Sequence, residues 1–245
     1  MKLLTSFGTY VLFIRSLFIN RERFSVYIKL IIDECMLIGL DSVFVVAIVS
    51  SFIGAVSAIQ TAYNLTSPIV PLSTVGTIVR DFTILENAPT FTCLVLAGKV
   101  GSSIAGGLGT MRITEQIDAI EVMGINSSSY LVLPKIIAAV MVFPMLVVIS
   151  GFLSIMGGYV SVVWGGVVTK HDYIYGLRDM FVPYNVFFAI IKAVVFAFLI
   201  SSISSFQGFY TKGGALEVGK SSTDAVTNSC IAVLLGDYII AKLLL

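Results

Sequence analysis

The most regular feature of the chain is a series of long apolar stretches separated by short polar ones. A helix that crosses the hydrocarbon core of a bilayer needs about 20 largely apolar residues. Five stretches meet this length: about 36–62, 89–109, 131–168, 184–206 and 225–245. The third is longer than one straight crossing requires, and Pro144, Gly151 and the pair Gly157 and Gly158 predict a tilted or bent helix. The pattern therefore predicts an all-α membrane protein with five transmembrane helices.

The first 35 residues have a different pattern. Apolar side chains recur there at helical spacing, and basic residues interrupt them. The apolar positions are Phe7, Tyr10, Val11, Ile14, Leu17 and Phe18, and the basic ones are Arg15, Arg21 and Arg23. This pattern favours an N-terminal interfacial helix, or elbow, over 1–35, ahead of a membrane-spanning domain over 36–245. A short sixth span broken by Arg15 is the alternative.

The composition supports the membrane assignment. Of the 245 residues, 57% are hydrophobic and 12% are charged, and the mean hydropathy is +1.00; ordinary globular proteins have roughly 25% charged residues. A soluble domain of this size could not hide so much apolar surface. The net charge of +1 and the lack of a dense basic cluster exclude nucleic-acid binding. Three separated cysteines and one histidine support neither a metal site nor a disulfide framework, and we expect no cofactor.

Basic residues indicate the orientation, because cytoplasmic loops are enriched in Lys and Arg. With a cytoplasmic N-terminus, the inner side holds Lys2, Arg15, Arg21, Arg23, Lys29, Lys99, Arg112, Lys135, Lys212 and Lys220. The outer side holds Arg80, Lys170, Arg178 and Lys242, and Lys192 lies inside a span. The excess on the inner side predicts a multi-pass protein of the cytoplasmic membrane with its N-terminus inside.

The most polar segment lies between the second and third stretches. Its charges fall at 112, 115, 118 and 121 and its apolar residues at 113, 117, 120 and 123, which predicts a short amphipathic helix that Gly124 ends. Such a helix is either a plain surface loop or the docking point of a soluble motor. The candidate coupling residues are Arg112, Thr114, Glu115, Gln116, Asp118 and Glu121.

A few polar residues lie within or beside the spans. Lys192 is inside the fourth, where an unpaired ammonium costs roughly 2.5–3.5 kcal/mol on insertion scales. With Glu86, Gln60 and Tyr63 it could line a cavity for a polar headgroup, or it could belong to a structural ion pair. For Asp237, near the chain end, a structural pairing or an interfacial position is favoured.

Small residues repeat every four positions along the second stretch. One register is Ala97, Gly101, Ala105 and Gly109, and a second is Gly98, Ser102, Gly106 and Thr110. In lipid, such stripes allow another helix to approach closely. The neighbour is either another helix of the same chain or a second subunit.

Residues 214–221 (GALEVGKS) match the phosphate-loop pattern G-x-x-x-x-G-K-[ST]. That loop binds phosphate only between a buried strand and a helix of an α/β domain. Here one span ends near Phe206 and the next begins near Ala225, so no such domain fits, and we expect no ATPase site in this chain. The chain also lacks H-E-x-x-H and G-x-S-x-G motifs, which argues against an intramembrane enzyme.

Residues 97–105 (AGKVGSSIA) and 109–124 (GTMRITEQIDAIEVMG) resemble the signature of the MlaE/YrbE permeases, the membrane subunits of MCE-type lipid ABC transporters. Shorter matches follow at 131–135, 191–196, 208–215 and 218–220. The resemblance covers nearly the whole chain and is weakest in 1–35 and 63–85.

The resemblance implies a homodimeric phospholipid permease of the bacterial inner membrane. It implies a separate cytoplasmic ABC ATPase that docks at 110–124 and an extracytoplasmic MCE-domain protein, and it allows a small STAS-domain subunit. Glu86 and Lys192 map to the lipid cavity. Family members commonly have Arg before the equivalent of Glu86, whereas this chain has Leu85, so Lys192 or Arg80 would have to contact a lipid phosphate. The rival interpretation is a secondary transporter in which Lys192, Glu86 and Asp237 relay charge down an ion gradient.

Overall fold

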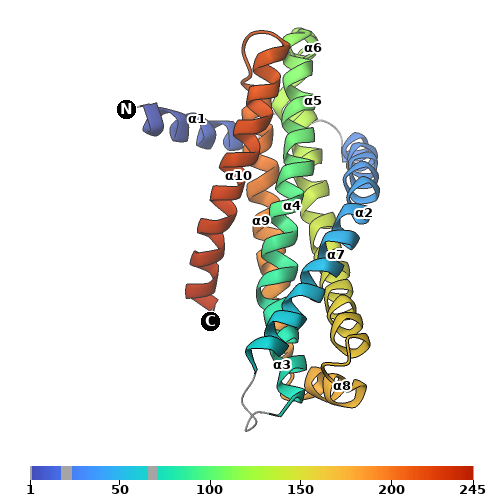
Figure 1. Cartoon of the computed structure of the whole chain (residues 1–245). Helices are drawn as coiled ribbons and strands as arrows, with labels where there is room; N and C mark the ends of the chain where they lie inside the picture. The colour runs from blue at the N-terminus through green and yellow to red at the C-terminus, as the bar shows by residue number, and fades with distance from the viewer. Residues whose placement is uncertain (1, 18–23, 66–70, 245) are drawn as a thin grey trace.

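The computed structural model describes residues 2–17, 24–65 and 71–244, and within these ranges every regular element is a helix. Five helical segments are long and apolar enough to cross a membrane: Val26–Asn64, Ser73–Ile113, Ser127–Trp164, Pro183–Phe209 and Ala215–Leu244. They form an elongated bundle with polar connections at its two ends (Figure 1). The five predicted spans are therefore confirmed as helices, although their ends differ from the predicted ones. Phe18, Arg21 and Arg23 of the predicted elbow lie outside the described residues.

The first long helix, α2 (Phe24–Asn64), begins twelve residues before the predicted start at Met36. Polar contacts hold this early part against α7 (Ser127–Trp164). The Tyr27 hydroxyl lies 2.7 Å from that of Ser129, and Glu34 forms an ion pair with Lys135. Because these polar groups are paired within the protein, the helix continues through a segment that is less apolar than a typical membrane span.

The second span is a composite helix. It consists of α3 (Ser73–Phe82), the π-helix η1 (Thr83–Phe91), α4 (Thr92–Leu96), a second π-helix, η2 (Ala97–Gly101), and α5 (Ser102–Ile113). Apolar length alone predicted 89–109, because α3 is amphipathic and η1 carries polar residues. π-Helical turns are rare and occur frequently at functional sites.

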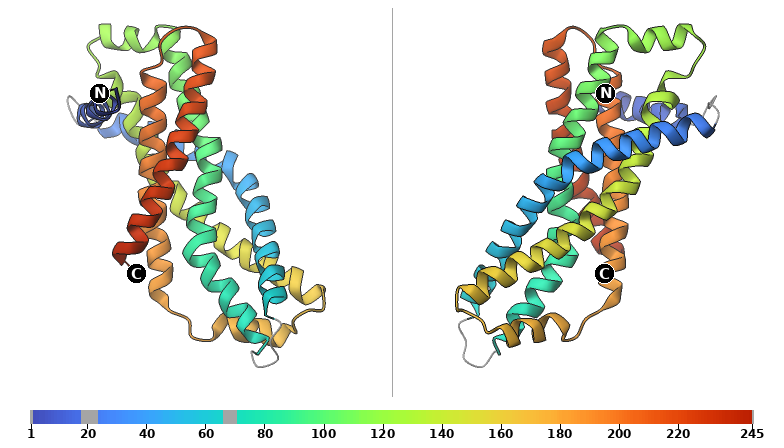
Figure 2. Two further views of the ribbon diagram at one scale, coloured as in Figure 1. Left: turned by 60° about the vertical axis from the view of Figure 1, so that its left-hand side comes forward. Right: turned by 90° about the vertical axis from the view of Figure 1, so that its right-hand side faces the viewer.

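Helices α2 and α7 cross at close range (Figure 2). A Cβ atom at Gly54 would lie 1.9 Å from the Ser154 carbonyl oxygen, and one at Gly157 would lie 2.1 Å from that of Ser51. Only glycine fits at these positions. The glycines of α7 thus allow contact with α2, and α7 itself continues as one helix past Pro134 and Pro144.

The first small-residue register of the second span packs within the chain, against α9 (Pro183–Phe209) and α10 (Ala215–Leu244). A Cβ atom at Gly208 of α9 would lie 2.6 Å from the Ala105 carbonyl oxygen, and one at Gly109 would lie 3.1 Å from the Val218 side chain. For this register, the open question is settled in favour of packing between helices of one chain.

Helix α1 (Lys2–Ser16) lies across the long helices near the end that carries α6, and it is not among the helices able to span a membrane (Figure 1). Among the side chains whose burial is described, Phe13 of α1 and Leu17 just after the helix are each 1% exposed, whereas Val11 of the predicted apolar face is 50% exposed. Phe13 packs in a ring cluster with Phe206, Phe209 and Tyr210. Helix α1 is therefore not a sixth candidate span, and its position in the membrane interface stays a prediction.

The end opposite α6 (Gln116–Val122) is closed by α3 and α8 (Lys170–Arg178). The Tyr173 ring is fully buried there, and burial raises the pKa of its hydroxyl. The Arg80 guanidinium is also buried, pairs with Asp81 at 2.9 Å, and donates hydrogen bonds to the carbonyls of Leu177 and Asp179. Arg80 is therefore engaged in the fold.

Candidate functional site

Three charged side chains from three segments meet in the bundle around Lys192 of α9. The Lys192 ammonium is 0% exposed and lies 3.0 Å from a Glu86 carboxylate oxygen and 2.5 Å from one of Asp237. The Thr90 hydroxyl lies within 3.2 Å of both carboxylates. With one positive and two negative groups, this charge cluster has a formal charge of −1. It is the ion pair that the membrane position of Lys192 requires, with a second carboxylate added.

The π-helix η1 shapes this charge cluster. Pro89 has no N–H and so cannot donate to the carbonyl of Leu85, four residues earlier. That carbonyl accepts a hydrogen bond from Lys192 Nζ at 3.0 Å. The Phe188 ring, 4.8 Å from Nζ, adds a cation–π contact on α9. Lys192 is thereby held by a carbonyl, two carboxylates and an aromatic face.

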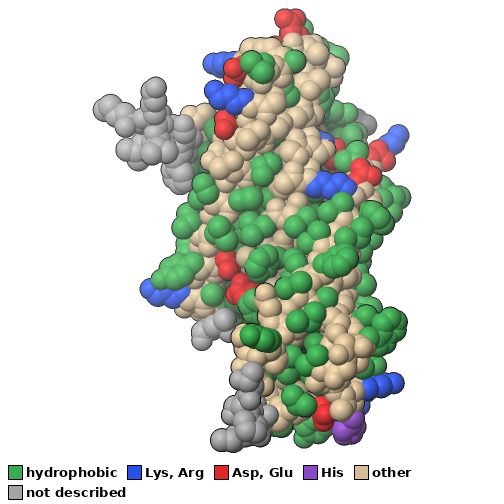
Figure 3. Space-filling view, viewed as in Figure 1, with side chains coloured by type: hydrophobic (Ala, Val, Ile, Leu, Met, Phe, Trp, Pro, Cys, Tyr) green, Lys and Arg blue, Asp and Glu red, His purple; other side chains and the backbone are tan. Residues whose placement is uncertain are grey.

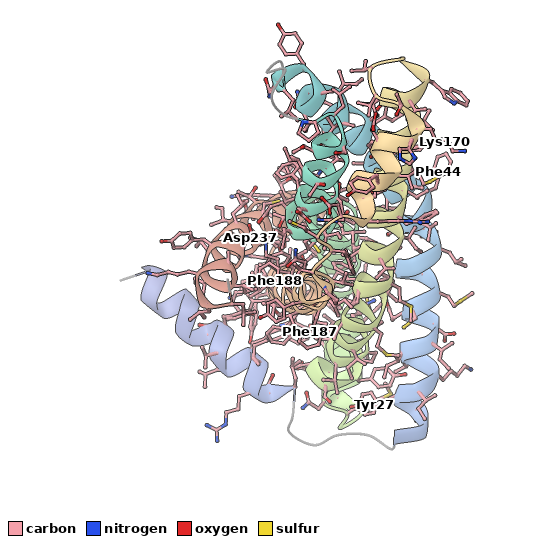
Figure 4. The ribbon with its side chains drawn as sticks, turned by 90° about the horizontal axis from the view of Figure 1, so that it is seen from below. Tyr27, Phe44, Lys170, Phe187, Phe188 and Asp237 are labelled. Atoms are coloured by element: carbon pink, nitrogen blue, oxygen red, sulfur yellow. The ribbon has the colours of Figure 1, made fainter. Side chains whose placement is uncertain are left out.

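For Asp237 the structure shows the structural pairing, one of the two alternatives that the sequence favoured. Its position near the chain end indicated an interfacial role or a structural pairing, and the structure places it in the charge cluster with its carboxylate 18% exposed. Figure 4 shows Asp237 on α10 and Phe188 on the neighbouring α9. The signal that could have identified it is simple: a carboxylate within a span needs a cation, and Lys192 is the basic residue found inside another span.

Gln60 and Tyr63 lie apart from the charge cluster. Within the part of the chain that the structure describes, no hydrogen bond or ion pair joins either of them to Glu86 or Lys192. With Ile59 and Asn64 they line a hollow at the end of α2, where the Tyr63 side chain is 79% exposed. Their place in a lipid cavity stays a prediction.

An apolar hollow borders the same elements that carry Glu86 and Lys192. Its volume is about 520 Å³, and it is lined mainly by aliphatic side chains of η1, α7 and α9. The lining includes Ile84, Ala88, Val147, Ile155, Val186 and Ile190. Elements η1 and α9 thus contribute both charged groups and an apolar surface, as the binding of an amphipathic molecule requires.

The predicted helix over the 110–124 segment is interrupted. Thr110 to Ile113 are the last turn of α5, and α6 begins only at Gln116. Glu115 between them has a φ of 60°, a left-handed conformation that breaks the helical path. Helix α6 ends at Val122, and Gly124 follows with a φ of 81°, as its sequence position predicted.

The coupling candidates differ in their contacts. Arg112 forms an ion pair with Asp118 at 2.7 Å, and Glu121 accepts a hydrogen bond from the Ser127 hydroxyl at 2.6 Å. Ile117 is fully buried and anchors α6 to the bundle. The side chains of Thr114, Glu115, Gln116, Val122 and Met123 are exposed. The end of the molecule at α6, labelled in Figure 1, therefore presents a mixed polar and apolar surface.

The residues of the phosphate-loop pattern have no phosphate-binding geometry. From Ala215 to Ser221 they form the first turns of α10, and no strand precedes them in the described chain. The Ser221 hydroxyl instead donates to the Gln207 carbonyl at 2.8 Å.

Comparison with known proteins agrees with this architecture. The family model described as "Permease MlaE" matches residues 31–243. A "Probable ABC transporter permease protein" of Rickettsia bellii is 38% identical over 242 residues, covering 99% of this chain and 93% of the relative. A "Probable ABC transporter permease protein" of Synechocystis is 31% identical, covering 87% and 81%. The Arabidopsis "Protein TRIGALACTOSYLDIACYLGLYCEROL 1, chloroplastic" is 31% identical, covering 83% and 58%.

Proposed function

The chain belongs to the MlaE permease family, and from this premise we propose that it is the membrane subunit of an ABC transporter that moves phospholipids between the inner membrane and an extracytoplasmic MCE protein. A permease of this class has no nucleotide site of its own, and ATP hydrolysis takes place in a separate ATPase subunit. The observation that carries the lipid assignment is the charge cluster of Glu86, Lys192 and Asp237 beside an aliphatic hollow.

Two further observations support a lipid substrate. A charged headgroup can exchange contacts with the partly exposed Glu86 carboxylate, whose side chain is 35% exposed, while acyl chains occupy apolar surface. The name of the Arabidopsis relative contains that of a glycerolipid. The phosphate contact missing at Leu85 can fall to Lys192 only when the headgroup displaces one of its carboxylate partners, because the polar contacts of both Arg80 and Lys192 lie within the fold.

The ATPase partner is proposed to dock on α6 and the turn before it. Helix α6 is anchored by Ile117 and leaves Glu115 and Gln116 exposed at the end of the bundle that holds the α9–α10 connection. That end is cytoplasmic if the basic residues obey the positive-inside rule. We further propose that two copies form the working permease in the bacterial inner membrane.

The reversed-charge variant Glu115→Lys with Asp118→Lys tests the docking surface. We expect the tagged variant to insert in the membrane but to lose the ATPase during gentle purification, because the docking surface reverses its charge. Glu217→Lys, at the start of α10 on the same end, is the matched control. Retention of the ATPase by the double variant would contradict the docking assignment.

Lipid transport is tested by mass spectrometry of the purified complex and by transfer of labelled phospholipid from vesicles that contain the complex to the MCE protein. The proposal expects bound phospholipid and ATP-dependent transfer.

The close contact of three charged groups also suits an ion-driven charge relay. Transfer that persists without ATPase and stops when an ionophore collapses the ion gradient would replace the proposal with that mechanism.

A further inference from the structure

A second charged region lies between α2, η2 and α7, away from Lys192. It is a partly open cavity lined by apolar residues and by Glu34, Asp41, Ser42, Lys99 and Lys135. Along the second span, Lys99 and Glu86 are 13 residues apart, roughly 20 Å at 1.5 Å per residue. This inner cavity therefore lies in the half of the bundle nearer to α6. Figure 3 shows basic and acidic side chains together in the upper right of its view, in the region of α2.

The charges of the inner cavity are only partly satisfied by the protein. Glu34 and Lys135 form an ion pair. Lys99 and Asp41 line the same space, and neither has an ion pair or hydrogen bond from its side chain within the described residues. Asp41 is exposed and Lys99 is half-buried, and charges that face lipid in a membrane span are costly unless each finds an opposite charge.

Ser42 gives an independent sign of a missing ligand. Its hydroxyl lines the inner cavity, the residue is 1% exposed, and the oxygen has no hydrogen-bond partner in the described chain. Ser50, by contrast, donates to the Val46 carbonyl one turn earlier at 2.6 Å, whereas Ser154 and Ser205 lack a partner among the described residues, as Ser42 does. A buried hydroxyl without a partner is unfavourable, so an acceptor placed in this space would be bound favourably.

We propose that the inner cavity binds the zwitterionic headgroup of a phospholipid from the membrane leaflet at the α6 end. The phosphate would accept from Lys99 and Ser42, and the amine would donate to Asp41. Leu37, which is 54% exposed, and the neighbouring aliphatic side chains would contact the acyl chains. An anionic headgroup without an amine would leave Asp41 unpaired beside a second negative charge, so the arrangement selects phosphatidylethanolamine over phosphatidylglycerol.

This inference goes beyond transport by the cluster around Lys192, because it assigns a separate site at the opposite half of the span. The test replaces Leu37 with benzoylphenylalanine in the full chain, reconstitutes it in nanodiscs with equal amounts of the two lipids, and identifies the photo-crosslinked lipid by mass spectrometry. We expect phosphatidylethanolamine to be labelled about tenfold more than phosphatidylglycerol, the factor that one lost charge contact of 1.4 kcal/mol gives. Asp41→Asn should abolish the preference, and Lys99→Gln should reduce labelling of both lipids.

Lys170→Gln, an exposed change at the other end of the bundle, is the control and should leave labelling unchanged. Soluble phosphoethanolamine and inorganic phosphate are added separately as competitors, to distinguish a headgroup site from a phosphate site. If either one reduces lipid labelling at millimolar concentration, the cavity is assigned to a soluble anion. Equal labelling of both lipids, or labelling unaffected by Asp41→Asn and Lys99→Gln in folded protein, would overturn the proposal. The measurement uses neither ATPase nor transport, so a failure of lipid transport would leave its result intact.

Discussion

The substitution Lys192→Met tests how far the charge cluster contributes to stability. Methionine has a similar length and is flexible enough to fill the same space, so the change removes the charge with little change in packing. It leaves Glu86 and Asp237, both within hydrogen-bond reach of the missing ammonium, as uncompensated carboxylates inside a span. Breaking a buried ion pair by removing one partner costs about 3–5 kcal/mol. We expect the upper part of this range, because two carboxylates lose their partner.

The neutral triple variant Lys192→Met with Glu86→Gln and Asp237→Asn separates lost contacts from orphaned charge. All three side chains keep their approximate size, but no carboxylate remains unpaired. Since replacing a whole buried ion pair with neutral groups is often close to neutral in free energy, we expect the triple variant to recover more than half of the stability that the single variant loses. Transport should stay lost if the charges contact the headgroup.

Heating the detergent-solubilised protein and measuring the fraction that stays monodisperse gives the comparison. A loss of 3–5 kcal/mol corresponds to a shift on the order of 10 °C in a chain of this size. The reasoning would be refuted by a single variant that melts within about 2 °C of the parent, or by a triple variant no more stable than the single one. Recovery of both stability and transport would make the charge cluster dispensable.

Two further predictions concern packing. Gly54→Ala should destabilise the protein by about 1–3 kcal/mol, because the new methyl would lie 1.9 Å from a backbone oxygen of α7. Gly98→Ala has open space around it and should leave stability unchanged or raise it by up to about 1 kcal/mol. The thermal stability of the two variants measures the difference. Phe13→Ala should release α1 from the bundle, because truncation of a buried Phe costs about 3–5 kcal/mol; hydrogen exchange of α1 should rise, while Leu12→Ala, at a 64% exposed position, should leave it unchanged.

The number of spans could be predicted from sequence because hydropathy depends only on composition along the chain. The ends of the helices could not, because they depend on tertiary pairing. Helix α2 extends back to Phe24 since Glu34 meets Lys135 from a helix about a hundred residues away. Helix α3 was missed for a related reason: its apolar face is covered by α8, a contact that the sequence of 63–85 does not reveal.

Part of the candidate site was also predictable. Glu86 was named with Lys192 as lining a cavity or forming a structural ion pair, and the structure shows the ion pair. For Asp237 the sequence favoured a structural pairing or an interfacial position, and the choice between them depends on how α10 packs against α9. The break at Glu115 was not predicted, because a left-handed backbone conformation carries no composition signal in a non-glycine residue. The resemblance to a family located the coupling segment, but the structure divided it into the end of α5 and a separate α6.

The two charged regions of the second span coincide with its two departures from α-helical geometry. Glu86 lies in η1, and Lys99 lies in η2. A π-helical turn holds more residues than an α-helical one, so each insertion rotates the side chains that follow relative to a regular helix. Near Glu86, Pro89 also lacks the N–H that a regular helix would use, and Lys192 contacts the Leu85 carbonyl. In an uninterrupted α-helix, Glu86 and Lys99 would point in other directions relative to each other. Glu86 could then not reach the charge cluster while Lys99 lines the inner cavity. The π-helical turns are thus the feature of the fold that allows one span to contribute a charged residue to two separate sites.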